Sequence, residues 1–202
     1  YTAGQSETML GKALGGKRQE VAIATKCGFR AGQAVIQAGL SRKHILASVE
    51  GSLKRLGTDY IDVYLIHIPD PFTPMEETAR ALDRVVRDGK VRYVGFCNHS
   101  AWQAQKFLSF QKAIGLAPMV TAQMHYSLLC RDIEHEMLPM LEDSGLGLMV
   151  WSPLSSGILT GKYTRENPVP EGSRRAKFDF PPVDLDLGYE VVSVLKDMAA
   201  AD

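Results

Sequence analysis

The stretch Ile61-Asp62-Val63-Tyr64-Leu65-Ile66, followed directly by His67, is the part of the sequence that decides the fold. Its apolar residues run together, which is typical of a strand buried on both faces of a parallel sheet. A helical pattern precedes it, beginning at Ser41 and ending at Gly57. A second helix is predicted from Thr73-Pro74-Met75-Glu76, which has the pattern of a capping box, to Gly89. Helix, strand and helix in this order indicate a β/α protein.

The same unit recurs along the chain. Further strands are predicted at Val21 to Thr25, Val91 to Phe96 and Leu146 to Val150, and another strand starts with Val120 to Ala122. Further helices are predicted from Ser6 to Gly15, from Ser100 to about Gly115, from Asp132 onward and from Tyr189 to Ala201. A long loop from Thr164 to Leu187 precedes the last helix. Five strands alternating with helices suit either an eight-stranded barrel or a doubly wound open sheet. The sequence contains no G-x-G-x-x-G and no G-x-x-x-x-G-K-[ST] between a strand and its helix, which favours the (β/α)8 TIM barrel within the α/β class.

Composition excludes several kinds of partner. The chain has 202 residues, 45% of them hydrophobic, with 23 Lys and Arg balanced by 23 Asp and Glu. Without a basic excess, binding to nucleic acid or to an anionic membrane surface is not expected. The apolar runs are far shorter than the roughly 20 residues of a membrane-spanning helix. Cys27, Cys97 and Cys130 are odd in number and lie in apolar runs, so we expect reduced thiols in a cytoplasmic protein.

Polar side chains follow the apolar runs at five points. They are Lys26, His67, Asn98, Gln123 and the pair Trp151-Ser152. In a β/α barrel the carboxyl ends of the strands carry the chemistry. Each residue taken singly also suits a structural role, but together they predict a site. We expect no metal site, because no His, Cys, Asp or Glu residues have the spacing of metal ligands, and there is no G-x-S-x-G or kinase signature.

Three segments resemble the aldo-keto reductase superfamily, whose members are β/α barrels that reduce carbonyls with NADPH. They are Ser48 to Asp70, Gly89 to Gly95, and Trp151 to Leu154 with Gly157 to Lys162. The sequence of these segments is most similar to that of the reductases related to potassium-channel β subunits. The resemblance covers nearly the whole chain and implies that the five strands are the third to seventh of eight. We therefore expect residues 1–202 to be one partial barrel domain, and Tyr1-Thr2-Ala3-Gly4 does not read as a natural start.

The resemblance also implies roles for particular residues. A catalytic set of Asp, Tyr, Lys and His is matched by Tyr1, Lys26 and His67, with the aspartate falling before Tyr1. For NADPH/NADP, Asn98 and Gln123 match the residues that hold the nicotinamide carboxamide, Trp151 matches the aromatic that stacks on the nicotinamide, and Ser152, Leu154, Gly157 and Lys162 match the pyrophosphate loop. Cys97 is a departure, since the family usually has Ser there and a thiol is the poorer hydrogen-bonding group.

These roles fit carbonyl reduction. Hydride addition leaves negative charge on the carbonyl oxygen, which needs a proton and hydrogen-bond donors. Tyr1 would donate the proton, Lys26 would lower the pKa of the phenol, and His67 would orient the carbonyl. The expected function is an NADP(H)-dependent oxidoreductase acting on a small aldehyde or ketone. NADH stays open as a cofactor, because the segment that recognises the adenosine 2′-phosphate follows the eighth strand.

Two alternative functions are compatible with the same residues. A regulatory subunit that binds NADP(H), contacts a membrane channel and turns over slowly or not at all would have the same pocket. An unrelated β/α-barrel lyase would use Lys26 as a Schiff-base nucleophile.

Overall fold

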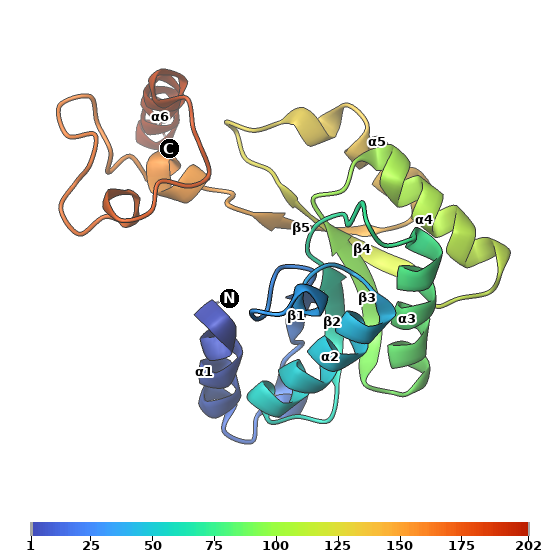
Figure 1. The fold of residues 1–202 in the computed structure, drawn as a ribbon. Coiled ribbons are helices and arrows are strands. Elements are labelled where there is room, and N and C mark those ends of the chain that lie inside the picture. Colours follow the sequence, from blue (N-terminus) through green and yellow to red (C-terminus); the bar gives the residue numbers. More distant parts are fainter. Residues whose placement is uncertain (1, 202) are drawn as a thin grey trace. The chain divides into compact units, whose positions relative to one another are not determined.

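The structure is a computed structural model that describes residues 2–201, and for Thr2 only the backbone. Strands and helices alternate along the chain (Figure 1). The strands are β1 (Ala24–Cys27), β2 (Ile61–Ile66), β3 (Val91–Cys97), β4 (Met119–His125) and β5 (Gly147–Trp151). The helices are α1 (Gln5–Leu14), α2 (Arg42–Leu56), α3 (Met75–Arg87), α4 (Ala101–Ala113), α5 (Met137–Ser144) and α6 (Leu185–Ala200). Short 3₁₀ turns lie at Thr2–Gly4, Arg18–Glu20, Val35–Gln37, Asp132–Glu134, Ser155–Thr160 and Arg174–Ala176.

The strands form one five-stranded sheet in the order β1-β2-β3-β4-β5, and β1 to β4 pair in parallel. Parallel neighbours in sequence order, each followed by a helix, are the arrangement of consecutive units in a β/α barrel. The predicted α/β class is therefore confirmed, and the sheet is consistent with part of a (β/α)8 barrel.

The chain divides into two compact units. The first comprises Tyr1–Gln123 and Met140–Leu148, and the second comprises Met124–Pro139 and Met149–Asp202. The first holds β1, β2, β3 and α1 to α4. The second holds α6 and the long segment before it.

In the first unit, the two faces of the sheet differ in burial. Alternate residues on one face are completely buried: Tyr64, Ile66, Val94 and Phe96. On the other face Leu65 is buried, but Lys26 is only half-buried and Tyr93 is 56% exposed. The buried sides of α2 and α3, including Ile45, Val49 and Leu82, complete this core. The face that carries Lys26 is therefore the more accessible one.

Glu7 ties α1 to the strand that carries Lys26. Its carboxylate accepts hydrogen bonds from Thr25 Oγ1 in β1 and from Arg55 Nε in α2, both at 2.6 Å. Burial alone raises the pKa of Glu7, but these hydrogen bonds outweigh it and hold the pKa below its usual value.

In the second unit, α6 packs on the 3₁₀ turn that follows β5. Gly188 allows this approach, because a Cβ there would lie 2.9 Å from Ile158 Cγ2, and Ile158 is completely buried. Tyr163 and Val192 are buried as well. A hydrogen bond of 2.9 Å joins the buried hydroxyls of Ser127 and Ser155. The 3₁₀ turn is therefore held both by its packing against α6 and by the hydrogen bond between Ser127 and Ser155.

Several predicted strand boundaries are wrong. β1 begins at Ala24, because the Ile23 amide bonds to the Asp62 carboxylate, and β1 runs to Cys27, so that Lys26 lies inside the strand. β4 runs on to His125, and β5 ends at Trp151, one residue later than predicted, so that Gln123 and Trp151 lie within strands and do not follow them. Pairing with the neighbouring strand extends β1 and β4 past their apolar runs.

Helix termini are partly as predicted. Ser41 caps α2, with its Oγ accepting from the His44 amide at 3.3 Å, and Gly57 ends it in the left-handed conformation. The predicted helix from Ser100 begins as expected, and the Ser100 amide donates to Gln103 Oε1 at 3.0 Å, as in a capping box.

Three other helix predictions are wrong. Thr73 Oγ1 donates to the Asp70 carboxylate and does not cap α3, which starts at Met75. Asp132 begins a 3₁₀ turn, while α5 starts five residues later. The last helix starts at Leu185, because Asp184 caps it by accepting from the Leu187 amide. Thr73 and Asp184 form local hydrogen bonds that the sequence pattern did not predict.

Across residues 2–201, none of the helices combines the length and apolar character that a membrane crossing requires.

Gly95 generates a stability prediction. A Cβ at this position would lie 2.4 Å from the Thr121 carbonyl oxygen and 2.7 Å from Leu65 Cδ2. We expect Gly95→Ala to lower the free energy of unfolding by about 1 to 3 kcal/mol, since the backbone must move to admit the methyl group. Chemical denaturation of the full-length protein measures this. Gly147→Ala is the control, because its nearest contact would be an ordinary 3.7 Å; equal stability of the two variants would contradict the prediction.

Candidate functional site

Strand register brings three of the predicted polar residues, together with Cys97, toward one edge of the sheet in the first unit. Lys26 pairs with Leu65, Leu65 with Gly95 and Gly95 with Thr121. His67 and Cys97 stand two residues beyond Leu65 and Gly95, and Gln123 pairs with Cys97. Because paired residues and residues two apart share a face, Lys26, His67, Cys97 and Gln123 all belong to the more accessible face at the carboxyl ends of the strands.

Asn98 connects the ends of three strands. It follows β3 directly and adopts the left-handed conformation, with φ of 55°. Its side-chain Nδ2 donates to the His67 carbonyl at 3.1 Å, and its backbone N–H donates to the Gln123 carbonyl at 3.4 Å. The predicted residues of this unit therefore form one connected group.

The charge of Lys26 acts on the groups around it. Burial first, and the nearby Lys26 ammonium second, lower the pKa of His67 to about 4. Burial raises the pKa of Cys97 to about 11, and Lys26 opposes that change. At neutral pH the imidazole is therefore uncharged and the thiol protonated. The thiol is also a weak donor, with Cys97 Sγ 3.9 Å from Gln123 Oε1.

In the second unit, the segment after β5 has an unusual backbone. Ser152, Ser155, Ser156 and Gly157 all have positive φ, between 48° and 94°. Left-handed conformations cost an ordinary residue about 1 kcal/mol or more, and they concentrate at ligand-binding segments. Hydrogen bonds from the Ser155 N–H to the Ser152 carbonyl (2.9 Å) and from the Gly157 N–H to the Leu154 carbonyl (2.8 Å) hold this segment in a tight turn.

Lys162 returns to this segment. A Cβ at Gly157 would lie 3.3 Å from Lys162 Cε and 3.5 Å from its Nζ, so the lysine passes directly over the glycine. The ammonium also lies 5.3 Å from the ring of the buried Tyr163. Leu154 is exposed, and its carbonyl accepts the Gly157 amide at 2.8 Å. Ser152, Leu154, Gly157 and Lys162 thus belong to one tight turn.

Trp151 has aromatic neighbours within its own unit. Its indole is nearly parallel to the His125 ring, at 4.3 Å between centroids, and to the Phe180 ring, at 5.9 Å. Burial lowers the pKa of His125, which favours the uncharged ring in this stack. The half-buried indole is therefore held in a fixed orientation.

Arg174 is a residue that the sequence patterns did not single out. Its guanidinium donates to Ser156 Oγ at 3.1 Å, and Ser156 in turn hydrogen-bonds to the Phe180 carbonyl. A second cation therefore approaches the turn that Lys162 covers. Arg174 lies in a Pro-, Gly- and Arg-rich loop, where spacing carries no structural signal. Tyr1, the predicted proton donor, is outside the described residues.

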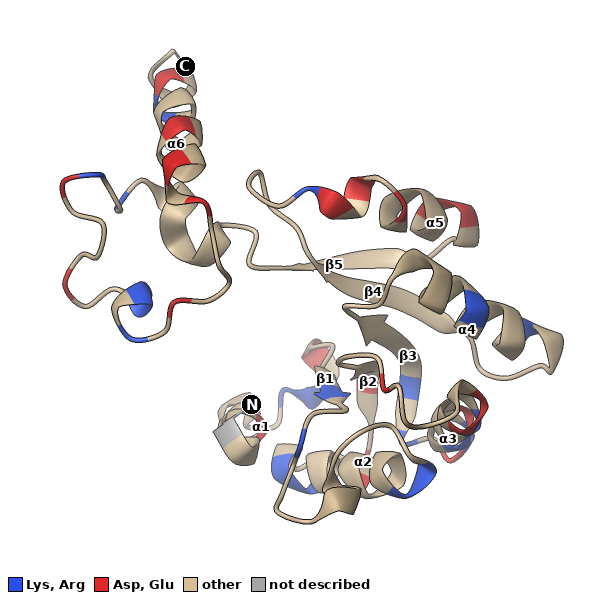
Figure 2. Cartoon of the chain, turned by 45° about the horizontal axis from the view of Figure 1, so that its top comes forward, with Lys and Arg blue, Asp and Glu red and all other residues tan. Residues whose placement is uncertain are grey.

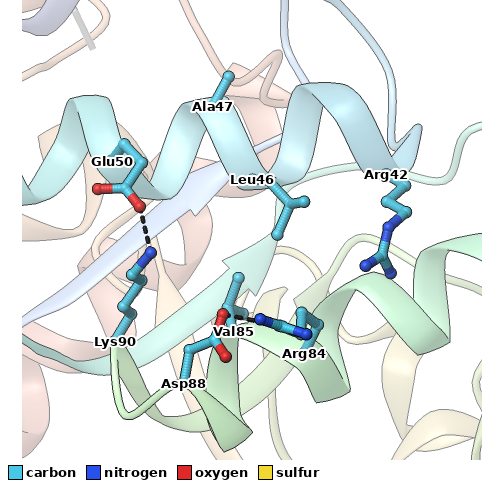
Figure 3. A pocket seen from close by; sticks show the side chains of 8 residues that line it. All are labelled: Arg42, Leu46, Ala47, Glu50, Arg84, Val85, Asp88 and Lys90. Atoms are coloured by element: carbon cyan, nitrogen blue, oxygen red, sulfur yellow. Dashed lines mark hydrogen bonds and ion pairs between the residues drawn. The ribbon is translucent and has the colours of Figure 1, made fainter.

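A separate hollow of about 430 Å³ in the first unit lies along α2 and α3 (Figure 3). Its lining consists of Arg42, Leu46, Ala47, Glu50, Arg84, Val85, Asp88 and Lys90. The charges pair with each other: Lys90 with Glu50, and Arg84 with Asp88 at 2.8 Å. Figure 2 shows both signs of charge on α3. None of the predicted site residues lines this hollow, so we do not take it as the candidate site.

A metal site has no support in the part of the chain that the structure describes. Among residues 2–201, no three His, Cys, Asp or Glu side chains are grouped so that they could hold a metal ion.

Comparison with known proteins gives a consistent picture. The profile of the Aldo/keto reductase family matches residues 1–201. The chain is 45% identical over 179 residues to a putative voltage-gated potassium channel subunit beta of Schizosaccharomyces pombe, covering 86% of this chain and 52% of that protein. It is 43% and 40% identical over 180 residues to probable voltage-gated potassium channel subunits beta of Oryza sativa subsp. japonica and Arabidopsis thaliana, covering 87% of this chain and 54% of each. The chain thus spans about half the length of these curated relatives.

The electrostatics of His67 can be measured. We expect its apparent pKa to lie near 4 in the folded protein, and Lys26→Met to raise it while leaving it below the ordinary value of about 6.5, because burial persists. Since the folded pKa is lowered, neutral His67 favours the folded state at neutral pH, and this contribution declines as the pH falls from about 6.5 toward 4. NMR titration of labelled histidine measures both values, with the exposed Lys43→Met as control. An unchanged His67 pKa in Lys26→Met would contradict the assignment.

Proposed function

Because the chain belongs to the aldo/keto reductase family, we propose that the protein binds NADP(H) and reduces an aldehyde or ketone to the alcohol. We also propose that residues 1–202 are part of one barrel domain. The observation that carries the proposal is the connected group at the strand ends of the first unit, where the Asn98 amide donates to the His67 carbonyl and Lys26 acts electrostatically on His67.

The residues present fit a nicotinamide dinucleotide. Asn98 and Gln123 each offer a carboxamide, which can both donate to and accept from the carboxamide of a nicotinamide. The turn at Ser152, Leu154 and Gly157, with the Lys162 ammonium over it, suits a pyrophosphate. Arg174 adds a second cation near that turn. A reduced nicotinamide supplies the hydride when bound.

The residues of the chain then handle the oxygen of the substrate. Neutral His67 can donate a hydrogen bond to the carbonyl oxygen, which aligns the carbonyl and stabilises the charge that develops there. Beside Tyr1, the Lys26 ammonium would favour tyrosinate over tyrosine and so lower the pKa of the phenol, which would give up its proton to the oxygen. Hydride at carbon and a proton at oxygen together yield the alcohol. The position of Tyr1 comes from the family resemblance.

The names of the relatives favour a second candidate. Three relatives carry the name of potassium channel β subunits, so a subunit that binds NADP(H) and turns over slowly would use the same residues. Consumption of NADPH by the full-length protein against a panel of carbonyls tests the reductase, with NADH in parallel. A single rapid turnover followed by slow release would favour the regulatory subunit, and cofactor binding without any hydride transfer would reject the reductase.

Tyr1→Phe in the full-length protein is expected to abolish carbonyl reduction, because the phenol supplies the proton. NADPH binding should persist, since the phenol contributes little to the cofactor site. Steady-state turnover and NADPH fluorescence titration measure the two effects. Turnover at the wild-type rate would refute the role of Tyr1.

Trp151→Ala is expected to weaken NADPH binding by roughly 1 to 2 kcal/mol, about 5- to 30-fold in Kd, through loss of an aromatic stacking contact. Trp102→Ala is the matched control, because that indole lies on α4 and is 65% exposed. Its Kd should equal that of the wild type. If both variants bind equally well, the Trp151 indole serves only in packing.

A further inference from the structure

His99 makes one hydrogen bond at the end of β3. Its ring is buried, with 7% exposed, and its Nδ1 lies 2.8 Å from the carbonyl oxygen of Cys97. Burial lowers the pKa of His99, which favours the neutral ring. Because a carbonyl oxygen can only accept, Nδ1 must carry the proton and donate.

That hydrogen bond joins the two residues on either side of Asn98. Cys97 is the last residue of β3, and Asn98 lies between the carbonyl and the ring that binds it. The imidazole therefore spans the residue whose φ is 55°. Asparagine tolerates this conformation better than most residues, but the conformation still carries a cost. A bond from the residue after Asn98 to the residue before it offsets that cost and holds the turn closed.

The ring itself is held in place. It packs edge-on against Phe96, at 5.3 Å between centroids, and Phe96 is completely buried. His99 also lines a hollow of about 340 Å³, together with Ile66, Trp102 and Phe107. A buried ring whose Nδ1 donates to the carbonyl before Asn98 has little orientational freedom. It can therefore transmit a fixed geometry to the turn.

We infer that His99 is a positioning residue for the Asn98 carboxamide. By holding the turn Cys97-Asn98-His99 closed, it keeps Asn98 Nδ2 on the His67 carbonyl and so fixes the orientation of the carboxamide. This inference rests on the proposed function, because the ligand of Asn98 is the nicotinamide carboxamide. It predicts that His99 affects the nicotinamide half of the cofactor and not the adenosine half.

The test compares two ligands and two variants of the full-length protein. In His99→Asn, the side-chain amide can donate from nearly the same position as Nδ1, whereas His99→Leu cannot donate. We expect His99→Leu to raise the Kd for NADP⁺ roughly tenfold, the scale of one hydrogen bond. The Kd for the fragment that lacks nicotinamide, 2′-phospho-ADP-ribose, should not change. His99→Asn should retain the wild-type Kd for both ligands.

Two results would overturn the inference: equal weakening of both ligands in His99→Leu, which indicates a general structural role, or no weakening of either. If His99→Leu does not fold, His99→Gln replaces it, because its longer amide misses the Cys97 carbonyl. Failure of the wild type to bind NADP⁺ would reject the proposed function instead. In that case crystal structures of the variants decide, since His99→Leu or His99→Gln should move Asn98 out of its left-handed conformation and His99→Asn should not.

Discussion

The close contact of β2, β3 and β4 around Gly95 determines where the polar side chains of the first unit lie. With no side chain at Gly95, the Thr121 carbonyl and Leu65 Cδ2 occupy the space that a Cβ would need. This contact fixes the register of three strands, and β1 follows through the pairing of Lys26 with Leu65. A slip of one residue would move the polar ends to the opposite face. The positions of the polar side chains in the site therefore depend on how these strands pack.

The ends of these strands replace sheet hydrogen bonds with bonds from polar side chains and turns. The His67 carbonyl accepts from the Asn98 amide group, the Cys97 carbonyl from His99, and the Gln123 carbonyl from the Asn98 backbone. Buried carbonyls that leave a sheet need such partners. Three of these residues, His67, Asn98 and Gln123, are also those that we assign to ligand binding. Their structural and functional roles are for this reason difficult to separate by deletion alone, and variants that retain a donor are more informative.

The sequence predicted the order of elements well and their ends poorly. Apolar runs are local features, and so were Ser41 and Gly57 at the ends of α2. The ends of β1 and β4 depend on pairing with distant strands, which a local pattern does not contain. For the site, Lys26, His67, Asn98 and Gln123 were predicted as a group because each stands near the end of an apolar run.

His99 and Arg174 were missed for a related reason. His99 follows the predicted residue Asn98 and reads as part of a turn, and its role is visible only through its bond to the Cys97 carbonyl. Arg174 reaches Ser156 across a separation of 18 residues. Neither partner is recognisable without the folded chain.

The charge states of His67 and Lys26 at the strand ends give these two residues different roles in the proposed reaction. Burial of the carboxyl edge keeps His67 uncharged, and the Lys26 ammonium strengthens that preference because two cations would repel each other. An uncharged imidazole can donate a hydrogen bond to an oxygen but does not store a proton at neutral pH. A positive potential from Lys26 stabilises negative charge on a phenolate or a carbonyl oxygen. We therefore propose that Lys26 supplies the positive potential and that His67 aligns the carbonyl of the substrate. The proton then comes from a group other than these two, which agrees with the role proposed for Tyr1.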